Sequence, residues 1–308
     1  MKPIARTAAP IFINKDEKRC INRHLCVHLH NVFTIYKIMK AKKILFITQE
    51  ITPFVPESER ALIGRNLPQA IQERGHEIRT FTPKWGIINE RRNQLHEVIR
   101  LSGMNLIIDE TDHPLIIKVS SIQAARMQIY FIDNDDYFQK RTMTCDPDGN
   151  EYEDNGERAI FYARGVLETV KKLRWVPDVI HCDGWITALA PIFIKKAYKD
   201  EPSFQNAKVV FTATSKEFQN DLGEHFADCL PFKDICKEDF EDVCNGKFGH
   251  TELSKIAVKY SDGLILGDEG VDPAIAEYAK SLNLPILENQ SEETYRDAYN
   301  SFYETVMD

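Results

Sequence analysis

The feature that most constrains the fold is a short β–α–β pattern that begins near residue 44. Ile44–Thr48 is a short run of residues that favour β-structure, typical of a buried strand in a parallel sheet. Apolar residues then recur at helical spacing over Leu62–Ile71, and Gly75 supplies a helix stop before a second strand at Glu77–Pro83. Parallel strands joined through a helix require a right-handed crossover, so this segment predicts a parallel α/β sheet.

Between residues 95 and 133 the pattern changes to short apolar runs separated by polar turns. Such runs predict antiparallel hairpins inserted in the α/β domain. The four expected strands are Val98–Leu101, Leu106–Ile108, Leu115–Val119 and Ile129–Ile132.

The parallel pattern resumes after residue 153. Asp154 and Asn155 are typical of a helix N-cap, and the acid-rich stretch 216–249 predicts short helices and loops with a solvated face. Helices are expected over 155–173, 184–199, 250–260, 272–281 and 291–306, and strands over 177–182, 207–212 and 263–266. The complete order of expected strands and helices predicts one Rossmann-like, doubly wound domain with a mostly parallel sheet and an inserted antiparallel hairpin region.

Three segments are expected along the chain: an N-terminal extension over 1–38, the Rossmann domain over 39–290 and a C-terminal helix over 291–308. The basic run Met39–Lys43 before the first strand is typical of a natural N-terminus, so the extension is expected to be disordered. Arg23–His30 contains cysteine and histidines but lacks zinc-finger spacing. The apolar face of the last helix is expected to pack on the domain, with docking of a partner as the other interpretation. Its members are Tyr295, Ala298, Phe302 and Val306.

Composition excludes several classes of function. The net charge of −8 argues against a nucleic-acid surface, and no apolar run reaches the roughly 20 residues of a membrane span. Seven irregularly spaced cysteines without a CxxC pair favour a reducing, cytoplasmic setting over a disulfide framework. The sequence offers no Walker loop, GxGxxG, Ser-His-Asp set or metal cluster, so neither a cofactor nor a metal is predicted.

Five stretches, in order, resemble the bacterial glycogen and starch synthases that use ADP-glucose. They are residues 43–54, 64–86, 152–158, 177–181 and 185–191, and they include Glu50-x-x-Pro53-Phe54 and Trp185. The resemblance implies the first of the two Rossmann-like domains of a glycosyltransferase, specifically a hexosyltransferase. That family transfers glucose from ADP-glucose to the non-reducing end of an α-1,4-glucan, and on this resemblance the chain lacks the second domain.

The resemblance also places candidate substrate-binding residues in the loops that follow the strands, while it assigns no catalytic residue. The carboxyl ends of parallel strands and the starts of helices form the ligand crevice of a doubly wound sheet, and helix N–H groups favour phosphate. The candidates are Glu50, Arg60, Arg65, Asp154, Asn155, Asp183, Trp185 and Thr214.

The loop after the first strand departs from the family pattern. Val55–Ala61 stands in place of Lys-Thr-Gly-Gly-Leu, and Glu57 and Glu59 bring negative charge to where phosphate would approach. A like-charge contact at about 5 Å costs about 3 kcal/mol at an effective dielectric near 20, and Arg60 offsets one such contact. The other interpretation is that both acids simply suit the helix dipole.

Two further departures remove side chains that the family uses. Asp183 and Gly184 stand at its His-Asp positions, where Asp183 has two interpretations, a helix N-cap or a partner for sugar hydroxyls. Ala213–Ser215 replaces Ile-His-Asn, so no imidazole remains there, and His181 is expected to be a satisfied core histidine.

These observations leave two main functions open. The first is a divergent glucosyltransferase acting on ADP-glucose and α-glucan, predicted to be inactive unless another chain supplies a second domain. The second is a non-catalytic regulatory module that binds glucan, sugar nucleotide or an intact synthase. A different small-molecule enzyme that reuses the cleft has no catalytic constellation in its support.

Overall fold

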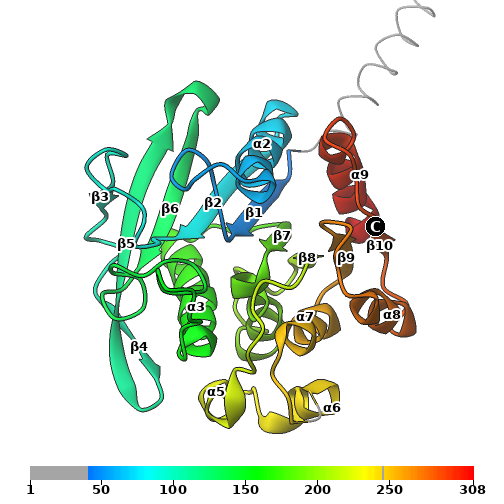
Figure 1. The fold of residues 1–308 in the computed structure, drawn as a ribbon. Coiled ribbons are helices and arrows are strands. Elements are labelled where there is room, and N and C mark those ends of the chain that lie inside the picture. Colours follow the sequence, from blue (N-terminus) through cyan, green and yellow to red (C-terminus); the bar gives the residue numbers. More distant parts are fainter. Residues whose placement is uncertain (1–40, 245) are drawn as a thin grey trace, which may run out of the picture. The chain divides into compact units, whose positions relative to one another are not determined.

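A computed structural model describes residues 41–244 and 246–308, so the predictions for residues 1–38, including the Arg23–His30 tract, lie outside the described residues. One mixed sheet forms the centre (Figure 1). Its strands are β1 (Lys43–Thr48), β2 (Glu77–Pro83), β3 (His96–Glu97), β4 (Met104–Ile108), β5 (Thr111–Ile122), β6 (Met127–Asp133), β7 (Val179–Asp183), β8 (Lys208–Ala213), β9 (Gly263–Leu266) and β10 (Ile286–Leu287). The helices are α2 (Glu59–Glu73), α3 (Asn155–Leu173), α4 (Ala190–Ile192), α5 (Gly223–Cys229), α6 (Glu241–Cys244), α7 (His250–Lys259), α8 (Pro273–Ser281) and α9 (Tyr295–Met307), with short helical turns η1 (Gln123–Ala125), η2 (Trp185–Thr187), η3 (Phe193–Ala197) and η4 (Lys237–Asp239).

The sheet confirms the predicted fold class. Its strand order is β10-β9-β8-β7-β1-β2-β6-β5-β3, and β4 pairs with β5 beside this path. All pairs from β10 to β6 are parallel, whereas β5 runs antiparallel to β6, β3 and β4. The inserted hairpin region therefore extends one edge of a parallel sheet, as the change of pattern after residue 95 predicts.

The prediction of a strand at Val98–Leu101 is wrong. The chain turns there, because the backbone N–H groups of Leu101 and Ser102 both donate to the carbonyl of Val98. Leu101 is buried and Val98 packs partly buried against the core, while Ile99 is 83% exposed, so the apolar residues serve a turn and not a strand face. The short strand lies just before it, at β3, and pairs with β5.

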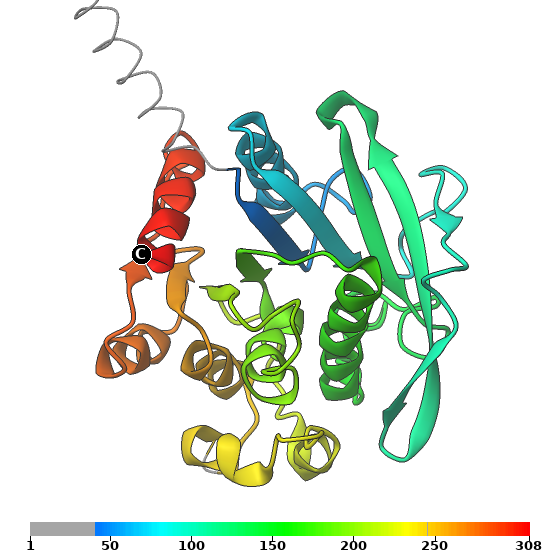
Figure 2. The same cartoon turned by 180° about the vertical axis from the view of Figure 1, so that it is seen from behind.

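Two apolar cores lie on opposite faces of the sheet (Figures 1 and 2), because neighbouring strand residues point to opposite sides. Ile44 and Phe46 of β1 belong to the face that α2 and α9 cover, whereas Leu45 and Ile47 face α3, α7 and α8. This arrangement matches the double winding predicted from the buried parallel strands.

Helix α9 returns to the centre of the molecule. It buries Tyr299, Phe302 and Tyr303 against the face that also holds α2, and Arg74 at the end of α2 forms an ion pair with Asp297. The last helix therefore contributes side chains close to the carboxyl ends of the central strands.

Candidate functional site at the carboxyl ends of the parallel strands

A polar crevice opens where the strand order reverses. β1 continues to β2 on one side, whereas β7, β8 and β9 lie on the other, so the reversal falls between β1 and β7. Open α/β sheets bind ligands at this position. The crevice has a volume of about 450 Å³ and is lined by Glu50, Ser58, Glu59, Arg60, Ile63, Asp183, Thr212, Ser215, Glu217, Gly267, Asp268, Gly270 and Tyr299.

The start of α2 is fixed against the end of β1. Ser58 caps the helix by accepting a hydrogen bond from the N–H of Ala61 at 3.0 Å, and its hydroxyl donates to Glu50 at 2.7 Å. A Cβ atom at Gly64 would lie 2.1 Å from the carbonyl oxygen of Glu50, so only glycine permits this approach. These contacts hold the first turn of α2, and with it Arg60, over the strand ends.

Arg60 lies among carboxylates. Its guanidinium is 3.3 Å from Asp183, 3.7 Å from Glu217 and 3.8 Å from Asp268, and its side chain is only 18% exposed. Burial lowers the pKa of Arg60, but the surrounding carboxylates, Asp183 first, outweigh burial and raise that pKa above its ordinary value. The prediction that Arg60 offsets Glu57 or Glu59 is therefore wrong, because its ion pairs are with residues of β7 and of the loops after β8 and β9.

The charge of the crevice is strongly negative. Among its described lining residues, five carry carboxylates and one carries a guanidinium; the five are Glu50, Glu59, Asp183, Glu217 and Asp268. Because the single arginine already pairs with three of them, little positive potential remains for an anionic ligand.

Asp183 is the most buried of these acids, and burial raises its pKa to about 6; Arg60 opposes this rise, whereas Glu217 and Glu50 add to it. Its carboxylate accepts hydrogen bonds from Arg60 and from the hydroxyl of Thr48. The predicted N-cap role is wrong, since no side chain caps the turn that begins at Trp185 and the carboxylate points into the crevice instead.

Glu217 links the crevice to the loop after β8. It accepts a hydrogen bond from the hydroxyl of Thr214 at 2.9 Å and another from the amide of Gln49. Thr214 is itself buried and does not line the crevice, so it acts on the site through Glu217.

The structure brings together only part of the candidate set. Glu50, Arg60 and Asp183 line the crevice, whereas Arg65 lies further along α2 and forms no ion pair with any described residue. Trp185 is buried against Phe218 and does not reach the cleft.

Asp154 and Asn155 lie elsewhere, at the start of α3. Asp154 occupies the N-cap position but makes no capping hydrogen bond, because its carboxylate pairs with Arg141. The amide of Asn155 donates to the carbonyl of Thr144 and accepts from Arg158. Both residues hold the loop before α3, so the prediction of Asp154 as a side-chain cap is wrong.

Sequence reasoning missed Glu217, Asp268 and Tyr299. Asp268 lies two residues after the end of β9, and the rule that parallel strands end at one edge would have placed it beside Asp183. No comparable signal marks Tyr299, because its position depends on how α9 packs.

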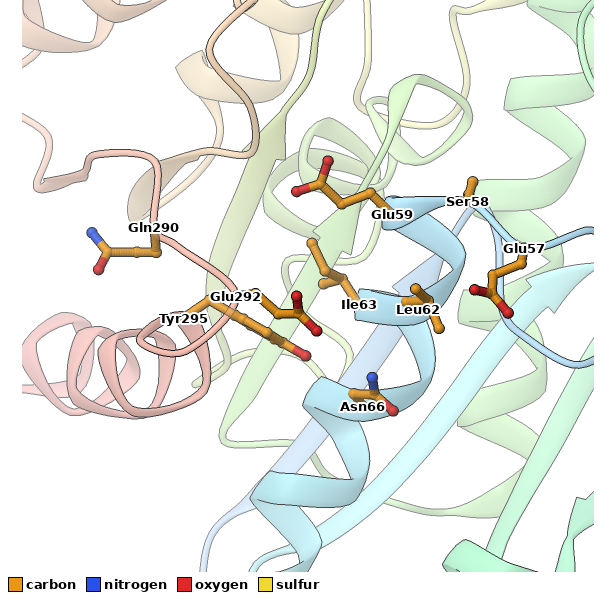
Figure 3. Close-up of a pocket in the computed structure, with 9 residues that line it drawn as sticks. All are labelled: Glu57, Ser58, Glu59, Leu62, Ile63, Asn66, Gln290, Glu292 and Tyr295. Atoms are coloured by element: carbon orange, nitrogen blue, oxygen red, sulfur yellow. The ribbon is translucent and has the colours of Figure 1, made fainter.

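A second cleft of about 370 Å³ adjoins the crevice and shares Ser58, Glu59 and Ile63 with it. Figure 3 shows side chains of α2 on one side of this cleft and Gln290 and Tyr295 on the other. The two clefts together follow α2 from the strand ends toward α9.

A family profile described as the starch synthase catalytic domain matches residues 43–277. The chain belongs to this family. A glycogen synthase of Chlorobium phaeobacteroides is 34% identical over 257 residues, which are 82% of this chain and 48% of that protein. A glycogen synthase of Chlorobium luteolum is 39% identical over 171 residues, covering 55% of this chain and 35% of its own length. The chain thus spans less than half the length of these starch synthase-family relatives.

A solved structure supports the fold of this starch synthase-family chain. The catalytic domain of starch synthase IV from Arabidopsis thaliana, described as bound to ADP and acarbose, matches with a TM-score of 0.65 and 16% identity. The match covers 81% of this chain and 52% of that chain. Within the described part of the chain, none of the helices combines the length and apolar character needed to cross a bilayer.

His181 has the structural role predicted for it. It is buried, with Nε2 2.7 Å from the hydroxyl of Thr212 and Nδ1 2.8 Å from that of Tyr303. Burial lowers its pKa to about 3, so the ring is neutral near pH 7 and joins α9 to the sheet beneath the crevice.

Proposed function

We propose that this starch synthase-family chain binds the hydroxyl groups of an α-1,4-glucan in its acidic crevice and does not by itself transfer glucose from ADP-glucose. The observation that carries the proposal is the set of five carboxylates around the already paired Arg60. A carboxylate is an acceptor that suits sugar hydroxyl donors, whereas each carboxylate about 5 Å from a diphosphate costs about 3 kcal/mol at an effective dielectric near 20.

The shape of the site supports the same ligand. The crevice volume of about 450 Å³ lies within the range usual for small-ligand sites, and the adjoining cleft along α2 lengthens it. Ile63 lies in both clefts, so an apolar surface is available beside the polar acceptors. An elongated polar groove with apolar patches fits a short oligosaccharide better than a compact nucleotide.

Calorimetric titration with maltoheptaose tests this proposal. Wild-type protein is expected to bind, and Asp183→Asn and Glu217→Gln are each expected to weaken binding about tenfold or more, because a hydrogen bond to a charged group contributes about 1.5–3 kcal/mol. Asp234→Asn is the matched control, since Asp234 lies on the surface in an ion pair with Lys199. Absence of binding to the wild type, or equal affinity for all variants, would reject the proposal.

Glucosyl transfer from ADP-glucose is the second candidate, favoured by family membership and by the ADP and acarbose named for the Arabidopsis structure. It predicts incorporation of labelled glucose into glycogen by the purified chain, alone or with a chain that supplies a second Rossmann-like domain. Turnover by the chain alone would reject the non-transferring part of the proposal, whereas turnover only with the second chain would make that chain its partner.

A further inference from the structure

We propose that Asp109, Glu157, His225 and Cys229 form a zinc-binding site. The four side chains come from three separate elements: the turn between β4 and β5, the first turn of α3, and α5. Figures 1 and 2 show the β4–β5 hairpin and α5 at the same end of the domain. None of the four lines the crevice, so this site is independent of the proposed function.

The distances from His225 to the other three side chains fit tetrahedral coordination. His225 Nε2 lies 3.5 Å from Asp109 Oδ2, 3.5 Å from Glu157 Oε1 and 3.6 Å from Cys229 Sγ. Zinc bonds of about 2.0–2.3 Å at tetrahedral angles separate ligand atoms by about 3.3–3.6 Å. The ligand atoms of Asp109, His225 and Cys229 also lie within 4.8 Å of one another, so small side-chain adjustments would complete the shell.

The three elements are held together by packing as well as by these polar groups. On α5, His225 and Cys229 are four residues apart and therefore share one helix face. Phe226 packs so closely on α3 that a Cβ at Gly156 would lie 2.5 Å from its ring. Arg164 of α3 donates to the carbonyl of Ile107 at 2.6 Å, which ties the end of β4 to the same helix.

A second layer of hydrogen bonds orients Glu157. Its Oε2 accepts from the Tyr137 hydroxyl at 2.8 Å, and that hydroxyl also lies 3.1 Å from Nε2 of His113. Oε1 is left facing His225. Outer partners of this kind orient ligating carboxylates and are typical of metal sites.

The ligand chemistry favours zinc over harder cations. One thiol, one imidazole and two carboxylates suit a borderline-soft ion, whereas calcium and magnesium prefer oxygen ligands alone.

Cobalt substitution tests the site in the full chain after chelator treatment. One equivalent of Co²⁺ is expected to give tetrahedral d–d absorption and a thiolate-to-cobalt charge-transfer band, both removed by added Zn²⁺. Cys229→Ser should abolish the charge-transfer band, and His225→Ala should weaken metal binding about a hundredfold or more. The controls Cys236→Ser and His96→Ala change exposed residues outside the cluster and should leave the spectrum unchanged.

A melting experiment checks folding of the same variants. Zn²⁺ is expected to raise the melting temperature of the wild type and of the controls, but not of His225→Ala, because only a ligand that binds the folded state stabilises it. A charge-transfer band that survives in Cys229→Ser would assign the metal to another cysteine and overturn the proposal. Absence of the band from the wild type would show that His225 only forms ion pairs with its two acidic neighbours, which also overturns it.

Discussion

Arg60 determines the electrostatics of the crevice. It is the only guanidinium among the described lining residues, and it is shared by Asp183, Glu217 and Asp268. A buried cation with three acidic partners lets those carboxylates remain close together, since it reduces their mutual repulsion. Its position therefore explains the compactness of the site, and it is the reason for the low affinity that we predict for further anions.

Arg60→Met is expected to destabilise the fold by about 3 kcal/mol at pH 8, because it leaves partly buried carboxylates without their counter-charge. The loss of unfolding free energy should be smaller at pH 5, because Asp183, whose pKa burial raises to about 6, then binds a proton. Urea unfolding measures both values, and Arg65→Met is the matched control on the same helix, expected to change stability by less than about 1 kcal/mol. Equal losses in the two variants would show that Arg60 contributes packing alone.

Asp183 makes stability depend on pH in a defined direction. Its pKa of about 6 in the folded chain exceeds the ordinary value near 3.9, so the folded chain binds the proton more tightly than the unfolded chain. The stabilisation of the folded chain that results from this tighter proton binding is fully present below about pH 4 and is lost as the pH rises through 6. Relative to Asp183→Asn, the wild type should lose about 2–3 kcal/mol of unfolding free energy between pH 4 and 8. A constant difference across that range would contradict this assignment.

At the scale of elements, the first turn of α2 positions the site. Ser58 and Gly64 fix this turn on Glu50 at the end of β1. The turn therefore provides Arg60 from a rigid helix instead of a loop, and the charge arrangement is set before any ligand binds.

Gly64→Ala is expected to reduce the unfolding free energy by about 3 kcal/mol, since the new methyl group would meet a backbone carbonyl 2.1 Å away and force α2 to shift. The same shift should weaken maltoheptaose binding. Gln69→Ala, on the same helix but outside both clefts, tests whether any alanine in this region has that effect. Unchanged stability of Gly64→Ala would show that α2 is not seated on β1 as described.

The elements that can be predicted best from the sequence are those whose own residue pattern specifies their structure. The parallel strands β1, β7 and β8 are mainly apolar and almost entirely buried, and that pattern predicts them. Val98–Leu101 has the same composition, yet its backbone hydrogen bonds close a turn, which no local pattern distinguishes.

The residues of the candidate site divide in the same way, into those that a local sequence pattern predicts and those that depend on packing elsewhere in the chain. Glu50 and Asp183 are predicted by the rule that ligands bind at the carboxyl ends of parallel strands, and the same rule could have predicted Asp268. Tyr299 comes from a helix at the far end of the chain, and its place in the crevice depends on packing over the whole sheet.

At the scale of the whole molecule, the chain combines a starch synthase-family fold with a crevice lined by five carboxylates. Residues 43–277 match the family profile, and the fold agrees with a solved starch synthase at a TM-score of 0.65. The fold is therefore that of the family, whereas the proposed glucan binding depends on the side chains of the crevice, because a fold alone does not determine function.

Parallel calorimetric titrations of the wild-type chain with ADP and with maltoheptaose test the central claim most directly. We predict a saturable heat of binding with maltoheptaose. With ADP we predict no heat of binding up to about 1 mM, which means a binding free energy less favourable than about −4 kcal/mol. The triple variant Asp183→Asn, Glu217→Gln, Asp268→Asn, which frees Arg60, is predicted to gain measurable ADP binding. Tight ADP binding by the wild type, unchanged in the triple variant, would contradict the account.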